Sequence, residues 1–209
     1  MYVPEQFAEH RLPVLHAAIA TAGLANLVTA GADGILVRPV PLMLDPDAGP
    51  YGTLIGHLAR GNPQWRTTDT AAEALAIFMG PDAYISPSYY QTKRETGKVV
   101  PTWNYVTIHA YGSIAFSEDT EELLEVVTRL TARHEANRAA PWAVSDAPPA
   151  FTQAQLKGIV SLRLQITRLQ GKWKLSQNRN AADKEGVAKG LASDGKPDLA
   201  ALVVERMGT

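Results

Sequence analysis

The stretch YISPSYYQTKRETGKVVPTWNYVTIHAYG, residues 84–112, decides how this chain folds. An apolar segment at Ala74–Met79 and a strand-like run at Ala83–Ser86 lead into it, and Val106–Ala110 alternates as a second strand. Seven of its residues are Tyr, Trp or His, which combine an apolar body with a polar tip. Gln91–Lys98 is polar and contains glycine, so we expect an exposed loop there. Two such strands can enclose a flat, partly polar ligand; the alternative is an aromatic sheet edge or dimer interface.

The composition predicts a soluble protein of the cytoplasm. Its 209 residues suffice for one domain with a sizeable core. The lack of cysteine excludes disulfides, thiolate metal sites and cysteine nucleophiles, and it fits a reducing compartment. A net charge of −1 gives no basic field, which argues against strong direct binding to DNA. No apolar run is long enough to span a membrane, and the start MYVPEQFAEHR lacks the pattern of a secretory signal.

Helical periodicity of apolar residues appears in four segments, with a shorter helical turn in a fifth. The four segments are His10–Ala22, Glu118–Asn137, Asn180–Leu191 and Asp198–Met207, and the turn is Thr152–Leu156. Gly186 and Gly190 weaken the pattern of the third segment, because glycine disfavours a helix interior.

The strands predicted from alternation are arranged like those of an antiparallel barrel. A hairpin is expected from Leu24–Thr29, the turn Ala30–Gly34 and Ile35–Leu44, whose prolines indicate an edge or a bulge. A third strand begins at Thr53–Gly56, and a long one spans Gly158–Leu169 before a turn at Gln170-Gly171 and a return at Trp173-Lys174-Leu175. The order of strands and helices predicts a closed or split barrel with helices at its ends.

The segment HLARGNPQW, residues 57–65, is a candidate anion site. It follows a strand, and backbone N–H groups at the start of a helical turn attract phosphate. Arg60 can bind a phosphate with its forked guanidinium. The alternative is a surface turn with a solvated arginine.

Motifs of other chemistries are absent from the sequence. It contains no GxSxG elbow, P-loop or HExxH pattern, and its glycines form no dinucleotide fingerprint. The five histidines lack the helical spacing of metal ligands, so no metal site or catalytic residue is assigned. His57 and His109 are candidates to meet in space, although structural histidines are the simpler interpretation.

Four ordered motifs and the opening MYVPEQF resemble those of a known family. The motifs are GHLARGNPQW (56–65), AYISPSYY (83–90), VPTWNYVTIHAYG (100–112) and KLSQNRNAADKEGVAKGL (174–191). Together they resemble the PaiB-like family, described as FMN-binding negative transcriptional regulators. The resemblance covers nearly the whole chain.

The resemblance implies a mainly β fold with helices, the split-barrel FMN-binding fold. We expect a six-stranded antiparallel, Greek-key-like barrel with peripheral helices, formed by residues 1–209 as a single domain with a helical appendage at about 180–209. The resemblance also implies a homodimer, with FMN in a groove at the dimer interface.

The resemblance further implies which residues bind FMN. Arg38 and Arg60 match the phosphate-binding positions, and His57 and Asn62 are expected to add hydrogen bonds. The flavin ring is expected to lie against Trp103-Asn104-Tyr105 and the Ser86–Tyr89 segment, including Ser86 and Tyr89. The late polar residues are expected to close the site or to brace it: Lys174, Ser176, Gln177 and Asn178.

Other functions remain open at this point. An FMN-dependent oxidoreductase or flavin reductase needs only a protein that positions the flavin, because the cofactor carries the chemistry. A haem-binding module on the same fold would use His57 or His109.

Overall fold

The computed structural model describes residues 1–32 and 34–207, and these residues divide into two compact units. Unit 1 consists of Met1–Leu15, Met79–Ile108 and the chain from Gln170 onward; unit 2 consists of His16–Phe78 and His109–Leu169. No helix of the described residues is both long enough and apolar enough to cross a membrane.

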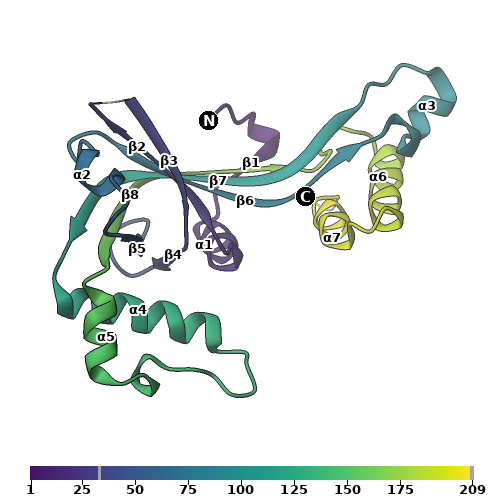
Figure 1. Ribbon diagram of the computed structural model, residues 1–209. Helices are drawn as coiled ribbons and strands as arrows, with labels where there is room; N and C mark the ends of the chain where they lie inside the picture. The colour runs from purple at the N-terminus through teal and green to yellow at the C-terminus, as the bar shows by residue number, and fades with distance from the viewer. Residues whose placement is uncertain (33, 208–209) are drawn as a thin grey trace. The chain divides into compact units, whose positions relative to one another are not determined.

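The strands form an antiparallel sheet in the order β3-β2-β6-β7-β8-β5-β4, with β1 paired to β8 (Figure 1). Their bounds are β1 (Ala8–Glu9), β2 (Ala25–Gly31), β3 (Gly34–Val40), β4 (Leu42–Asp45), β5 (Thr53–Ala59), β6 (Ala74–Ile85), β7 (Thr102–Ser117) and β8 (Ile159–Lys174). The described residues thus give eight strands where six were expected. The short β1 and the division of the predicted Ile35–Leu44 strand at Pro41 account for the other two.

The β2–β3 hairpin is confirmed. Gly31 pairs with Gly34, whose φ of 105° lies in the left-handed region that glycine tolerates. The predicted turn Ala30–Gly34 includes Asp33, which lies outside the described residues. β3 ends the sheet order, as Pro39 predicted, because proline has no N–H to donate to a further strand.

The predicted turn at Gln170-Gly171 is wrong, because β8 continues through it to Lys174. A Cβ atom on Gly171 would lie 2.3 Å from Leu15 Cδ2 and 3.1 Å from the Glu9 carbonyl oxygen. This glycine therefore allows the close approach of β1 and Leu15 to β8, rather than a reversal of the chain.

The four helices predicted from periodicity are confirmed as α1 (Leu12–Thr21), α4 (Thr120–Glu135), α6 (Ala181–Ser193) and α7 (Pro197–Glu205). The shorter segments are α2 (Gln64–Thr67), α3 (Gln91–Thr96), α5 (Pro149–Leu156), η1 (Glu5–Phe7), η2 (Pro87–Tyr89) and η3 (Val144–Asp146).

Helix α3 occupies the segment predicted to be an exposed loop. Asp183 of α6 accepts hydrogen bonds from the Thr92 backbone N–H and hydroxyl, both at 2.9 Å. A helix start needs partners for its first N–H groups, and here the partner comes from a residue far along the chain. Gly97, with a φ of 68°, ends the helix.

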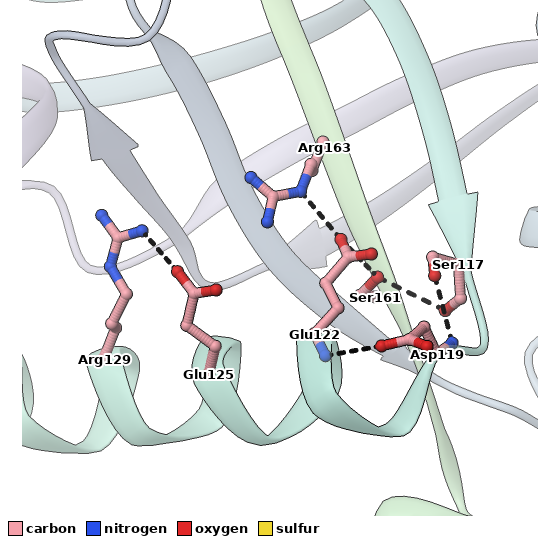
Figure 2. Close-up of polar contacts among 7 residues, drawn as sticks. All are labelled: Ser117, Asp119, Glu122, Glu125, Arg129, Ser161 and Arg163. Atoms are coloured by element: carbon pink, nitrogen blue, oxygen red, sulfur yellow. Dashed lines mark hydrogen bonds and ion pairs between the residues drawn. The ribbon is translucent and has the colours of Figure 1, made fainter.

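Helix α4 packs on the sheet of unit 2 through apolar and charged contacts. Val126 and Leu130 pack with Met43 and Ile55 in one buried cluster. Figure 2 shows the N-terminal turns, where the Asp119 carboxylate accepts from the Glu122 backbone N–H at 2.8 Å.

Glu122 fastens this helix to β8. Its carboxylate accepts from Arg163 Nε at 2.8 Å and from the Ser161 hydroxyl at 3.1 Å (Figure 2). Burial raises the pKa of Glu122, but the hydrogen bonds from Arg163, Ser117 and Ser161 outweigh burial and hold that pKa below its ordinary value. The Glu122 carboxylate therefore stays charged at neutral pH and holds the start of α4 against β8.

Candidate functional site

The residues expected to bind FMN divide between the two units. Arg38, His57, Arg60 and Asn62, expected near the phosphate, belong to unit 2; the residues expected near the ring and the late polar residues belong to unit 1.

Arg60 lies just after β5, where the chain turns toward α2. Its backbone N–H donates to the Gly158 carbonyl at 2.8 Å, and its carbonyl accepts from the Trp65 indole at 3.0 Å. Nη1 pairs with Glu118, and Nη2 lies 3.5 Å from the Ile159 carbonyl. The buried Nε has no hydrogen-bond partner among the described residues. Arg60 therefore retains a donor for an anion, although Glu118 offsets part of its charge.

Asn62 and Arg38 differ in their surroundings. Asn62 Oδ1 accepts from the Gln64 backbone N–H at 3.0 Å and so braces the turn after Arg60. Arg38 is exposed on the edge strand β3, and its Nη1 donates to the Val37 carbonyl at 2.7 Å. No carboxylate within residues 1–32 and 34–207 forms an ion pair with Arg38. Its charge is therefore available to an anion.

His57 lies on the face of β5 that packs against α4. Side chains alternate along a strand, so His57 shares a face with Ile55, which packs with Val126 and Leu130. Burial lowers the pKa of His57, which keeps the imidazole neutral at neutral pH. Its buried Nδ1 has no hydrogen-bond partner in the described part of the chain.

Trp103 and Tyr84 form an exposed aromatic pair on unit 1. Their ring centroids are 6.1 Å apart with an interplanar angle of 73°, an edge-to-face arrangement. Trp103 is 53% exposed and Tyr84 is 49% exposed. Two large aromatic side chains so exposed on neighbouring segments are typical of a surface that another molecule covers.

Ser86 and Tyr89 make contacts that fix the chain around η2. The Ser86 hydroxyl accepts from the Ser88 backbone N–H at 3.1 Å. The Tyr89 hydroxyl donates to the Asp194 carboxylate, which raises the pKa of Tyr89 to about 12. Tyr89 therefore stays protonated at neutral pH and connects η2 to the end of α6.

The late polar residues brace unit 1. The buried Asn104 side chain donates to the Ser176 hydroxyl at 3.0 Å, and that hydroxyl is 3.2 Å from Asn104 Oδ1. Ser176 has a φ of 67°, which is uncommon for a residue with a Cβ atom, so this pair holds a strained turn. Gln177 accepts from the Leu175 N–H at 2.7 Å and donates to the Trp173 carbonyl at 2.6 Å. Asn178 is exposed.

Lys172 and Lys174 form a cationic pair at the end of β8, on one face of the strand. Their ammonium groups lie 5.2 Å and 5.8 Å from the Tyr105 ring centroid. Lys174 Nζ donates to the Thr102 hydroxyl at 2.6 Å and to the Trp103 carbonyl at 2.8 Å. Burial lowers the pKa of Lys174, Tyr105 opposes this shift, and the charge of Lys172 adds to it.

This pair places two positive charges, without a carboxylate partner among the described residues, on one face of unit 1. Neither lysine forms an ion pair with a carboxylate of the residues that the structure describes. Lys172 is only 8% exposed, and its ammonium donates to the Tyr2 carbonyl at 3.2 Å. The sequence prediction missed Lys172, because the turn expected at Gly171 concealed the Lys-Trp-Lys alternation of a continuing strand.

Solved structures share this fold. The chain matches the FAD and haem binding protein of Mycobacterium smegmatis with a TM-score of 0.60 and 18% identity over 89% of this chain and 80% of that chain. It matches the flavocytochrome Anf3 of Azotobacter vinelandii with a TM-score of 0.59 and 11% identity over 82% of this chain and 72% of that chain. At these identities the likeness concerns the fold alone. That fold is the flavin-binding split barrel, mainly β with helices, as the sequence predicted.

Sequence relatives then give the family. The family described as "Putative FMN-binding domain" matches residues 1–168. The chain is 32% identical over 198 residues to the protease synthase and sporulation protein PAI 2 of Bacillus subtilis, covering 95% of this chain and 92% of that protein. An uncharacterized Aspergillus fumigatus protein is 34% identical over 236 residues, covering 91% of this chain and 90% of that protein. The chain belongs to this PaiB-like family of FMN-binding domains, whose cofactor is FMN, and the predicted resemblance is confirmed.

Proposed function

We propose that this chain binds FMN as a cytoplasmic homodimer and takes part in negative regulation of transcription. The observation that carries the cofactor site is the Lys172–Lys174 pair against Tyr105, two ammonium groups without a carboxylate partner among the described residues. Such a pair suits the electron-rich carbonyl edge of a planar ring. When bound, FMN supplies electron and hydride transfer, and the protein supplies orientation and charge.

Each unit, taken by itself, contains groups that suit one end of FMN. The unpartnered Nε of Arg60 and the exposed guanidinium of Arg38 suit the phosphate, as the family resemblance assigns them. Lys172 and Lys174 suit the ring edge, with Tyr105 beside it. Asn104 and Ser176 hydrogen-bond to each other, and Gln177 donates to the Trp173 carbonyl; these bonds hold the backbone next to the two lysines.

Lys174→Met and Arg60→Met are expected to have different effects on FMN and riboflavin, which lacks the phosphate. Lys174→Met should lower the affinity for both ligands by about 10- to 100-fold, because a charge-assisted hydrogen bond to the ring is lost. Arg60→Met should lower the affinity for FMN by a similar factor of about 10 to 100 and leave the affinity for riboflavin nearly unchanged. Quenching of flavin fluorescence on titration measures both ligands.

Lys189→Met is the matched control, because Lys189 is exposed on α6 and no hydrogen bond or ion pair to it is seen in the described chain. Its affinity for FMN should equal that of the unmodified protein. The ring-site assignment fails if Lys174→Met changes only the affinity for FMN. The phosphate-site assignment fails if Arg60→Met also lowers the affinity for riboflavin. A colourless protein that does not quench added FMN would overturn the cofactor proposal itself.

The exposed Tyr84–Trp103 pair supports the dimer. Both rings lie in unit 1 with about half of their surface open to solvent, and aromatic residues are enriched at subunit contacts. We assign a second copy of this chain to that surface, because the family resemblance implies a homodimer.

Trp103→Ser is therefore expected to weaken the dimer about 30-fold or more, the usual effect of removing an aromatic hot spot. Sedimentation equilibrium at several protein concentrations measures the change. Trp142→Ser serves as the comparison, since Trp142 is similarly exposed, at 48%, but belongs to unit 2. Equal dimer constants for both variants would contradict the assignment.

The regulatory role rests on the resemblance to the PaiB-like family, which is described as negative transcriptional regulators. A net charge of −1 does not suit a regulator that depends on broad electrostatic contact with DNA. It better matches a regulator that acts through a protein partner or a small ligand.

A further inference from the structure

Unit 2 contains a cavity whose lining includes, apart from His57, none of the residues expected to bind FMN. Its volume is about 330 Å³, within the range of small-molecule sites. Its walls come from β5, α4, α5, the start of β8 and the segment that joins the two helices. Helices α4 and α5 contact each other (Figure 1). Leu130, Leu156 and Ile159 are among its apolar lining residues.

The walls are held by contacts outside the cavity. Glu122 fixes the start of α4 to Arg163 of β8, as Figure 2 shows. Arg129, also on α4, donates to Asp45 of β4 at 3.0 Å. The joining segment is fixed where the Trp142 backbone N–H donates to Glu135 at 3.1 Å. The cavity is therefore formed before any ligand arrives.

The lining residues favour an uncharged aromatic ligand. Trp142 and Phe151 line the cavity and are 48% and 55% exposed, so their rings are open to a partner. No lysine, arginine, aspartate or glutamate belongs to the lining that the structure describes. A charged ligand would therefore be buried without a countercharge, which is costly.

One buried polar atom is left without a partner. His57 lines the cavity, and its buried Nδ1 forms no hydrogen bond with the described protein. A buried polar atom without a partner costs free energy, and a ligand hydroxyl or N–H group would remove that cost. Burial also lowers the pKa of His57, so the neutral ring accepts an uncharged hydrogen-bonding group. His57 also borders a neighbouring hollow that Pro41, His134 and Glu135 line.

We infer that this cavity binds an uncharged aromatic small molecule with one hydrogen-bonding group, held between Trp142 and Phe151 and bonded to Nδ1 of His57. This assigns His57 to a site of its own on the α4 side of β5, and it does not rest on FMN binding. A ligand there would contact α4 and α5.

Three naphthalene probes test the inference on the full chain. Isothermal titration calorimetry should show that 2-naphthol binds saturably, at one site per chain and about tenfold more tightly than naphthalene, which lacks the hydroxyl. The anion 2-naphthoate should bind at least about tenfold more weakly than 2-naphthol, because its charge would be unpaired. His57→Phe should abolish the preference for 2-naphthol over naphthalene.

Phe151→Ala should weaken 2-naphthol about tenfold. Val204→Ala, which removes an equally exposed side chain of unit 1, should change nothing. Phe151→Ala should keep the affinity for FMN, so failure of this site and failure of the cofactor site are distinguishable. The inference would be overturned if 2-naphthol does not saturate below about 1 mM, if 2-naphthoate binds more tightly than 2-naphthol, or if Phe151→Ala leaves the affinity for 2-naphthol unchanged. A Phe151→Ala protein that loses its dimer would also overturn it, since the face would then be a subunit contact.

Discussion

Gly186→Ala is expected to destabilise the protein by about 2–3 kcal/mol, although alanine is the better helix former by about 1 kcal/mol. Gly186 lies within α6, and a Cβ atom there would be 2.0 Å from the Tyr89 carbonyl oxygen. One turn later, a Cβ on Gly190 would be 2.4 Å from Tyr89 Cδ1. These glycines lie on one face of the helix, so η2 rests directly on the α6 backbone.

Asp194 continues this face by another turn and accepts the Tyr89 hydroxyl hydrogen bond. The methyl group added at Gly186 would meet a backbone carbonyl, so a side-chain rotation cannot relieve the clash. Thermal unfolding followed by circular dichroism should show a melting temperature about 4–12 °C lower.

Gly23→Ala provides the matched control, because no atom lies within 4 Å of a Cβ built at Gly23. It should be neutral or stabilise by about 0.4–1 kcal/mol through the unfolded chain. If Gly186→Ala instead raises the melting temperature as Gly23→Ala does, the close contact between η2 and α6 is contradicted.

These glycines show what sequence patterns can and cannot predict. Apolar periodicity predicted α6 despite Gly186 and Gly190, but periodicity could only count the glycines as a weakness. Their reason is Tyr89, far away in the sequence, whose backbone carbonyl lies against Gly186 and whose ring lies against Gly190. The fold class was predictable because the ordered motifs carry family information over most of the chain.

Contacts between distant residues explain the errors in the prediction. α3 was missed because its first turn is completed by Asp183, and a polar segment without that partner would be a loop. β8 was divided at Gly171 because the close approach of Leu15 leaves no local signal. The candidate site shows the same limit. Lys174 was predicted from a motif, whereas Lys172 could be predicted only by recognising that β8 continues past Gly171. The placement of Arg60 at a phosphate stays a prediction.

Glu9→Gln is expected to cost about 3–5 kcal/mol in the free energy of unfolding at pH 7. Glu9 is 3% exposed and belongs to β1, which pairs with β8. Its Oε1 accepts from Arg11 N and Nε at 2.8 Å and 2.9 Å, and its Oε2 accepts from Arg11 Nη2 at 2.7 Å. Arg206, beyond α7, also donates to Oε2. One carboxylate thus joins the N-terminal strand to the end of the chain.

Glutamine keeps the size of the side chain but cannot balance these guanidinium groups, and its amide N–H would face donors. Glu5→Gln is the matched control, since Glu5 pairs only with the exposed His10, at 3.2 Å. An exposed pair of this kind contributes about 0–1 kcal/mol. Urea unfolding at pH 7 should therefore separate the two variants clearly, and coincident midpoints would contradict the anchoring role of Glu9.

The contacts of Glu9 with Arg11 and Arg206 also determine how the free energy of unfolding depends on pH. Hydrogen bonds from the Arg11 side chain, with Arg206 adding to them and burial opposing them, lower the pKa of Glu9 to about 2 from an ordinary value of 4.5. A carboxyl group whose pKa is lower in the folded state binds protons more readily when unfolded, so its contribution is complete above pH 4.5 and is lost as the pH falls toward 2. The gap in stability between the unmodified protein and Glu9→Gln should therefore be widest at neutral pH and shrink across this interval. Because the amide of the Glu9→Gln variant binds no proton in this range, a gap that stays constant down to pH 2 would show that the lost contribution comes from packing and not from the charge of Glu9.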